Sequence, residues 1–180
     1  MQGKFEEAER EILRVQEIDP LSAGVRLHLT ELYYYWRKSD KSIEQAELML
    51  TAQPENIGIY AFLARAHNQK GDFEKAFAAL EKLTPGDGTR VSVLASNGRR
   101  EEALKITETI AASDEGDKSP YWVACLYAVI GEREKAFEWL EKSYAMRQAD
   151  LVSMKIDPAL DSLRDDLRYR NLLKRVNLEE

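Results

Sequence analysis

The sequence is poor in the residues that build disulfide-linked or metal-bound folds. It has a single cysteine, Cys125, which excludes an internal disulfide and a multi-cysteine zinc site. With only nine glycines and five prolines in 180 residues, it is neither collagen-like nor of low complexity. The longest apolar run, residues 121–130, covers about half the length of a membrane-spanning helix. Because no charged and then apolar leader opens the chain, we expect a cytoplasmic protein without a membrane partner.

Positive charge is also scarce for a nucleic-acid-binding protein. There are 26 basic and 32 acidic side chains, a formal net charge of −6, so we expect no nucleic-acid partner. The stretch with Arg164, Arg168 and Arg175 is locally basic, but without an aromatic platform it is interpreted as a solvated surface. The remaining composition, 44% hydrophobic and 32% charged, is typical of a globular chain rich in helix-forming residues.

A short pattern recurs along the chain. Each copy has a glycine, two further residues of which the first is charged, and Glu-x-Ala at the start of an apolar-periodic stretch. The copies begin at Gly3, Gly71, Gly98 and Gly131. The first two are 68 residues apart, twice 34, and Arg37 stands where the copy between them would begin. Later copies follow at spacings of 27 and 33 residues, so the pattern predicts a repeat protein.

Each unit is predicted to be a pair of amphipathic helices. Apolar residues recur at three- and four-residue intervals over 23–36 and 57–70, before the turn, and again after it. The glycine suits a left-handed end to the first helix. A small residue in the second helix would let the paired helices approach closely. This position is filled by Ala8, Ser42, Ala76, Ala103 and Ala136. One pair cannot bury both its faces, so the units must stack.

The 34-residue period, the turn, the small residue and the closing prolines (Pro20, Pro54) resemble tetratricopeptide repeats. The resemblance implies an all-α fold, a right-handed superhelix of antiparallel helix pairs over residues 1–145. It divides the array into a half repeat at 3–22 and repeats at about 23–56, 57–88, 89–115 and 116–147. Residues 148–180 do not continue the repeat and are predicted to form a capping segment of short helices, near 151–154, 158–163 and 166–176.

Both ends of the chain carry expectations. The helix over residues 4–18 has no first helix before it, so its apolar face needs either a preceding part of a longer chain or a second copy. The tail resembles those that close many bacterial tetratricopeptide proteins, where Asp-Pro, Leu-Arg and Leu-Leu recur. Asp157 and either Asp165 or Asp166 are predicted to cap its helices.

No set of residues predicts catalysis, a metal site or a cofactor. His28 and His67 lack ligands at metal-binding spacing, and His67 is interpreted as a packed core residue. Cys125 has no evident base beside it. The glycine-rich stretch 85–90 lacks the strand and the lysine of a phosphate loop. We therefore expect a protein that is not an enzyme.

The resemblance implies that the first helices line a concave surface that binds a partner protein or peptide. The residues placed on this surface are Leu27, Glu31, Tyr34, Tyr35, Arg65, Asn68, Gln69, Ser92, Ser96, Tyr121 and Cys125. The leading hypothesis is a noncatalytic binding scaffold. The alternative is a C-terminal regulatory or sensor region of a larger bacterial enzyme, kinase or transcription regulator.

Overall fold

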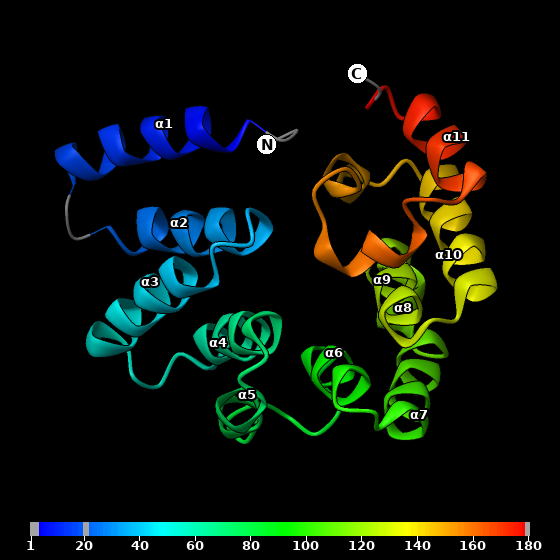
Figure 1. The fold of residues 1–180 in the computed structure, drawn as a ribbon, viewed down its shortest axis with the longest axis horizontal. Coiled ribbons are helices and arrows are strands. Elements are labelled where there is room, and N and C mark those ends of the chain that lie inside the picture. The colour runs from blue at the N-terminus through cyan, green and yellow to red at the C-terminus, as the bar shows by residue number, and fades with distance from the viewer. Residues whose placement is uncertain (1–3, 20–21, 179–180) are drawn as a thin grey trace. The chain divides into compact units, whose positions relative to one another are not determined.

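The structure is a computed structural model that describes residues 4–19 and 22–178, so the turn at Gly3 and the proline at position 20 lie outside the described residues. Within this part the chain forms helices and no strand, which confirms the all-α fold. Figure 1 shows the helices in chain order. They form two compact units that divide after Pro85, and each unit is described by itself.

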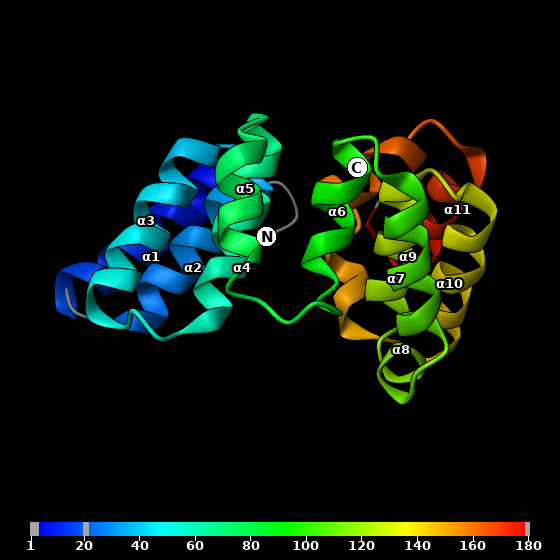
Figure 2. The same ribbon diagram turned by 90° about the horizontal axis from the view of Figure 1, so that it is seen from below.

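The N-terminal unit consists of five α-helices. They are α1 (Phe5–Ile18), α2 (Ala23–Tyr35), α3 (Ser39–Ala52), α4 (Ile57–Lys70) and α5 (Phe73–Leu80). Helices α2 and α3 pack against each other, as do α4 and α5, which lie side by side in Figure 2. These are the helix pairs that the apolar periodicity predicts.

The C-terminal unit contains α-helices and two short 3-10 helices. They are α6 (Thr89–Ser96), α7 (Arg100–Ala111), α8 (Asp114–Lys118), α9 (Pro120–Ile130), α10 (Arg133–Ala145), η1 (Ala149–Ser153), η2 (Pro158–Leu163) and α11 (Leu167–Arg175). Helices α6 and α7 form one pair and α9 and α10 another. The sequence did not predict α8, a single turn whose N-terminal Gly116 amide donates to the Ser113 hydroxyl at 3.2 Å.

The turns between paired helices have the backbone conformation that their glycines predict. The φ angles of Gly71 and Gly131 are +82° and +85°, in the left-handed region that side chains with a Cβ adopt at a cost. Arg37, at the position where the repeat pattern lacks its glycine, has a φ of +59°. The turn is therefore conserved in shape along the array even where the glycine is replaced.

The small residue of the second helix is buried throughout the described pairs. Ser42, Ala76, Ala103 and Ala136 are all 0% exposed. The Ser42 hydroxyl donates to the Thr30 carbonyl oxygen at 2.9 Å, so even the one polar member has a partner in the helix it packs on. A larger side chain at any of these positions would push the paired helices apart.

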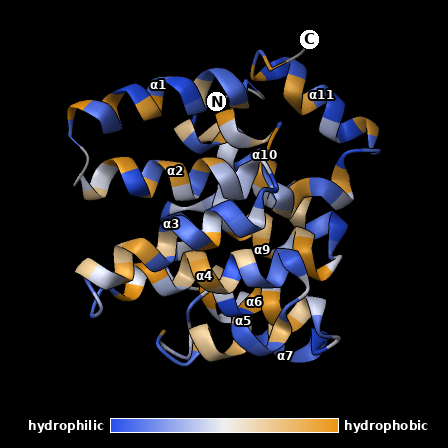
Figure 3. Cartoon of the chain, turned by 60° about the vertical axis from the view of Figure 1, so that its left-hand side comes forward, coloured by the Kyte–Doolittle hydropathy of each residue, from blue (hydrophilic) through white to orange (hydrophobic). Residues whose placement is uncertain are grey.

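Helix α1 covers one side of α2 and leaves part of its own apolar surface exposed. Phe5, Ala8 and Ile12 pack against the core cluster of α2, and the rings of Phe5 and Trp36 stack with centroids 5.5 Å apart. Val15 is 50% exposed and Ile18 is 85% exposed. Figure 3 shows hydrophobic patches along the otherwise hydrophilic ribbon of α1.

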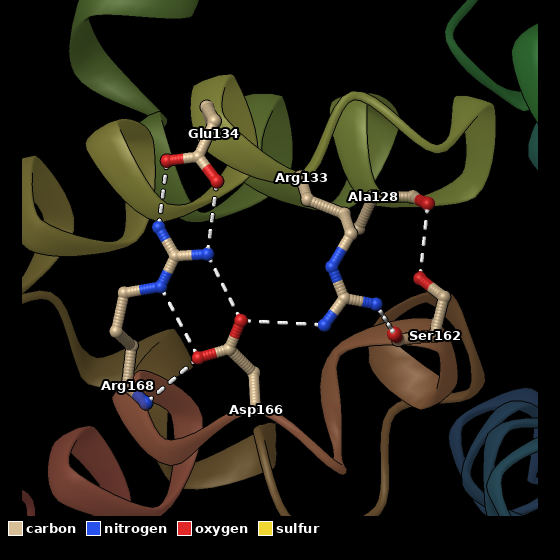
Figure 4. Close-up of polar contacts among 6 residues, drawn as sticks. All are labelled: Ala128, Arg133, Glu134, Ser162, Asp166 and Arg168. Carbon is tan, nitrogen blue, oxygen red and sulfur yellow. Dashed lines mark hydrogen bonds and ion pairs between the residues drawn. The ribbon is translucent and has the colours of Figure 1, made fainter.

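The C-terminal segment packs on the last helix pair, and two of its contacts with this pair join residues 34 positions apart. The Ser162 hydroxyl donates to the Ala128 carbonyl oxygen, 34 residues earlier in the chain. Arg168 makes a two-pronged ion pair with Glu134, again 34 residues apart (Figure 4). Thus η2 packs on α9, and α11 is joined to α10 one repeat period later. The predicted caps are present, with Asp157 capping η2 and Asp166 capping α11.

Candidate functional site

Helices α2 and α4 bring together three aromatic rings and one cation in the N-terminal unit. The guanidinium carbon of Arg65 lies 5.9 Å from the ring centroid of Tyr34 and 5.0 Å from that of Phe62. The ring of Tyr35 meets that of Tyr34 edge to face, with centroids 5.4 Å apart. All four side chains are partly exposed. We call Tyr34, Tyr35, Phe62 and Arg65 the aromatic–arginine face.

Sequence reasoning missed Phe62. It precedes Arg65 by three residues, a spacing that places two side chains on the same side of a helix. This spacing was the signal that could have found it. The stems of arginine side chains pack well on aromatic rings, and the guanidinium gains from the ring face. Phe62 therefore holds one side of Arg65, and Tyr34 holds another.

The other predicted residues of the N-terminal unit have mixed roles. Gln69 is occupied by the fold, because its amide nitrogen donates to the Tyr34 carbonyl oxygen at 3.3 Å and its amide oxygen accepts from the Ser39 hydroxyl at 2.8 Å. Leu27 and Asn68 are partly exposed. The Glu31 carboxylate lies 3.6 Å from the imidazole of His28 on the same helix.

The predicted residues of the C-terminal unit do not share one accessible surface. Ser96 is exposed, and Ser92 is partly buried with its hydroxyl donating to the Thr89 carbonyl oxygen. Tyr121 and Cys125 are buried, 6% and 8% exposed. Their predicted placement on an open surface is therefore wrong for this structure, because the segment around η2 covers this side of α9.

A carboxylate from the covering segment meets the two buried residues. Asp157, itself 7% exposed, accepts a hydrogen bond from the Tyr121 hydroxyl at 3.1 Å. The same carboxylate oxygen lies 3.7 Å from the sulfur of Cys125. The other oxygen of Asp157 accepts from the Ala159 amide at the start of η2. This one side chain fixes η2 and joins it to α9.

The environment of Cys125 is unsuited to a nucleophile. Burial raises the pKa of its thiol well above the ordinary value, and the negative charge of Asp157 raises that pKa further. The thiolate is the reactive form, so the thiol is held in its inert state. Among residues 4–19 and 22–178, no group of three or more His, Cys, Asp or Glu side chains is placed to hold a metal ion.

Arg164, Arg168 and Arg175 of the C-terminal segment are engaged in ion pairs. Arg168 bonds both Glu134 and Asp166, and Asp166 also bonds Arg133 (Figure 4). Hydrogen bonds from Arg168 hold the pKa of the Asp166 carboxyl well below its usual range. Arg175 makes a two-pronged pair with Glu141. These cations connect helices of the fold rather than forming a free basic patch.

His67 is a packed core residue, as the sequence predicts. It is 8% exposed, and burial lowers the pKa of its imidazole below the ordinary value of 6.5, an effect that Asp72 opposes. The folded protein therefore prefers the neutral ring, whereas the unfolded chain takes up a proton below about pH 6.5. The stability from the neutral ring is present above this pH and is lost as the pH falls toward the folded-state pKa.

We expect the His67→Gln variant to lose part of the acid sensitivity of the wild type. Between pH 7.5 and 5.5 its free energy of unfolding should fall less steeply, by up to about 1.4 kcal/mol per pH unit. Urea unfolding at a series of pH values would measure the difference. His28→Gln, which changes an exposed imidazole, is the matched histidine control. Equal slopes for wild type and His67→Gln would contradict the prediction.

One repeat of this architecture matches a known protein family. Residues 57–84, which include α4 and α5, match the family model of the tetratricopeptide repeat. No curated protein sequence matches the chain. Within the described residues, no helix combines the length and the apolar character needed to cross a membrane.

Proposed function

We propose that this tetratricopeptide repeat protein is a noncatalytic scaffold that binds a protein or peptide partner on the face of α2 and α4. Tetratricopeptide repeats generally serve protein interaction, and the matched repeat contains α4 and therefore Arg65 and Phe62. The observation that carries the proposal is the aromatic–arginine face. Aromatic and arginine side chains are the types most enriched among binding hot spots.

The form of the face favours an elongated ligand. Helices α2 and α4 pack against each other, and each contributes two partly exposed side chains to the face. A peptide strand or a helix can contact both helices at once and gain from several anchors. The rings supply a large contact area at low cost in side-chain entropy.

Three observations support the noncatalytic part of the proposal. The thiol of Cys125 is buried with a raised pKa, so it is a poor nucleophile. The imidazole of His67 is buried in the core of the N-terminal unit. Carboxylates such as Glu134 and Glu141 are engaged by arginines in structural ion pairs. Among residues 4–19 and 22–178, this arrangement singles out no acid–base pair.

We expect the double variant Tyr34→Ala/Arg65→Ala to bind its partner at least about tenfold more weakly than the wild type, because it loses a ring and the cation together. Partners would first be identified by affinity capture and mass spectrometry. Each would then be purified, and its affinity measured by isothermal titration calorimetry. Circular dichroism should show unchanged helix content, since both side chains are partly exposed.

A matched double variant provides the control. Leu48→Ala/Lys82→Ala changes one apolar and one basic side chain, both exposed, outside the aromatic–arginine face. Its affinity should stay within about twofold of the wild type. If the Tyr34→Ala/Arg65→Ala protein kept full affinity for every verified partner, this face would not be the binding site.

A further inference from the structure

The repeat makes residues of α4 and α9 equivalent, position by position. Each helix ends at a glycine in the left-handed conformation, Gly71 for α4 and Gly131 for α9. Counting back from these glycines pairs Arg65 with Cys125. The groups that contact Cys125 on α9 therefore indicate which kind of ligand could contact Arg65 on α4.

In the C-terminal unit this surface is covered by a short segment that places a carboxylate on it. Asp157 lies against Tyr121 and Cys125, at 3.1 Å and 3.7 Å. Ile156 and Leu160, on either side of it in the chain, are 5% and 0% exposed. The protein thus uses its own segment, an acidic residue between aliphatic ones, to cover this face of α9.

On α4 the equivalent position is a cation that lacks an acidic partner. The described residues place no carboxylate within ion-pair distance of Arg65, whose Nε donates to the Ala61 carbonyl oxygen at 3.4 Å. Other cations of this unit are paired, such as Lys41 with Glu9 and Lys70 with Asp40. Arg65 is held between two rings and presents its remaining donors at a partly buried site.

We propose that the partner presents an aspartate or glutamate beside an aliphatic side chain, and that its carboxylate pairs with Arg65. The aliphatic side chain packs on Phe62 and the neighbouring tyrosine rings. This inference rests on the proposed scaffold function and adds the chemistry of its ligand. The charge of the site and the equivalent carboxylate in the C-terminal unit both lead to an acidic peptide.

A nucleic acid fits the site less well than such a peptide. Binding a phosphodiester chain requires several cations along its path. Here a single arginine, Arg65, stands among the aromatic rings of the face. One cation beside aromatic rings matches one carboxylate beside an apolar side chain.

The test is selection from a displayed library of random 12-residue peptides against the intact chain. We expect the enriched peptides to share an acidic residue next to an aliphatic one. Synthetic copies should bind at least about tenfold more weakly to Arg65→Glu, and also to Arg65→Met, which keeps the stem between the rings. Lys82→Glu makes the same charge change at an exposed position and should stay within about twofold of the wild type.

Each other outcome overturns a defined part of the proposal. Enriched peptides without acidic residues, or peptides insensitive to both Arg65 variants, would refute the acidic ligand and leave the scaffold function standing. A 12-nucleotide single strand that bound as tightly as the acidic peptides, with the same dependence on Arg65, would refute the peptide assignment. If the wild type enriched no peptide and captured no verified partner, the scaffold function and this inference would fail together.

Discussion

Replacing Leu160 by alanine should lower the free energy of unfolding of the C-terminal unit by about 2–5 kcal/mol. Leu160 is 0% exposed and belongs to η2, which packs on α9. The substitution removes buried apolar area and leaves a cavity, and a single 3-10 turn has little of its own stability with which to close it. Urea unfolding followed by tryptophan fluorescence would measure the loss.

Cys125 provides a second readout for the same variant. Its thiol is buried under the segment around η2 and has a raised pKa, so a thiol reagent reaches it only when this segment opens. The labelling rate should rise at least about tenfold in Leu160→Ala. Val152→Ala, in η1 and 56% exposed, is the control and should change stability by no more than about 0.5 kcal/mol. If the two variants had the same labelling rate and the same stability, η2 would not be what protects Cys125 on α9.

Replacing Gly116 by alanine should destabilise the same unit by about 3 kcal/mol, because the new methyl group has no space. A Cβ at this position would lie 2.2 Å from the carbonyl oxygen of Ile110 and 3.1 Å from the Cα of Ala111. Both are backbone atoms, so the clash is relieved only by moving α8 away from the end of α7. That movement would strain the cap in which Ser113 accepts from the Gly116 amide.

Gly86→Ala is the matched control for this substitution. A Cβ at Gly86 would meet no atom within 4 Å. Alanine there should be neutral or stabilise the protein by up to about 1 kcal/mol, through reduced freedom of the unfolded chain. Chemical denaturation of the two variants in parallel would decide the matter. Equal stability of Gly116→Ala and Gly86→Ala would mean that α8 adjusts without cost.

The parts of the fold that depend on local pattern could be predicted from the sequence. Spaced glycines and apolar periodicity predict the helix pairs, because a left-handed turn and an amphipathic helix each leave a local signature. At Arg37 the spacing of the repeat predicts the structure although the residue type does not. The repeat places a turn there although no glycine marks it, and the structure has the left-handed conformation at this residue.

The cover on α9 could not be predicted in the same way. The segment around η2 consists of short 3-10 helices, which lack the three- and four-residue periodicity that identifies an α-helix. Its place on α9 depends on contacts such as that between Asp157 and Tyr121, 36 residues apart. The predicted exposure of Tyr121 and Cys125 was therefore wrong, while the capping role of Asp157 was right. Gly116 escaped notice because its constraint is a tertiary contact with Ile110.

The regular separation between bonded partners has a consequence for how the chain folds. Bonds that join successive helices of the repeat link residues a similar short distance apart in sequence, such as 32 residues for Lys41 and Glu9 and 34 for Arg175 and Glu141. The contact order is therefore low, as in other helical repeat proteins. No step has to close a long loop before native contacts form, so folding can nucleate in any helix pair and spread to its neighbours.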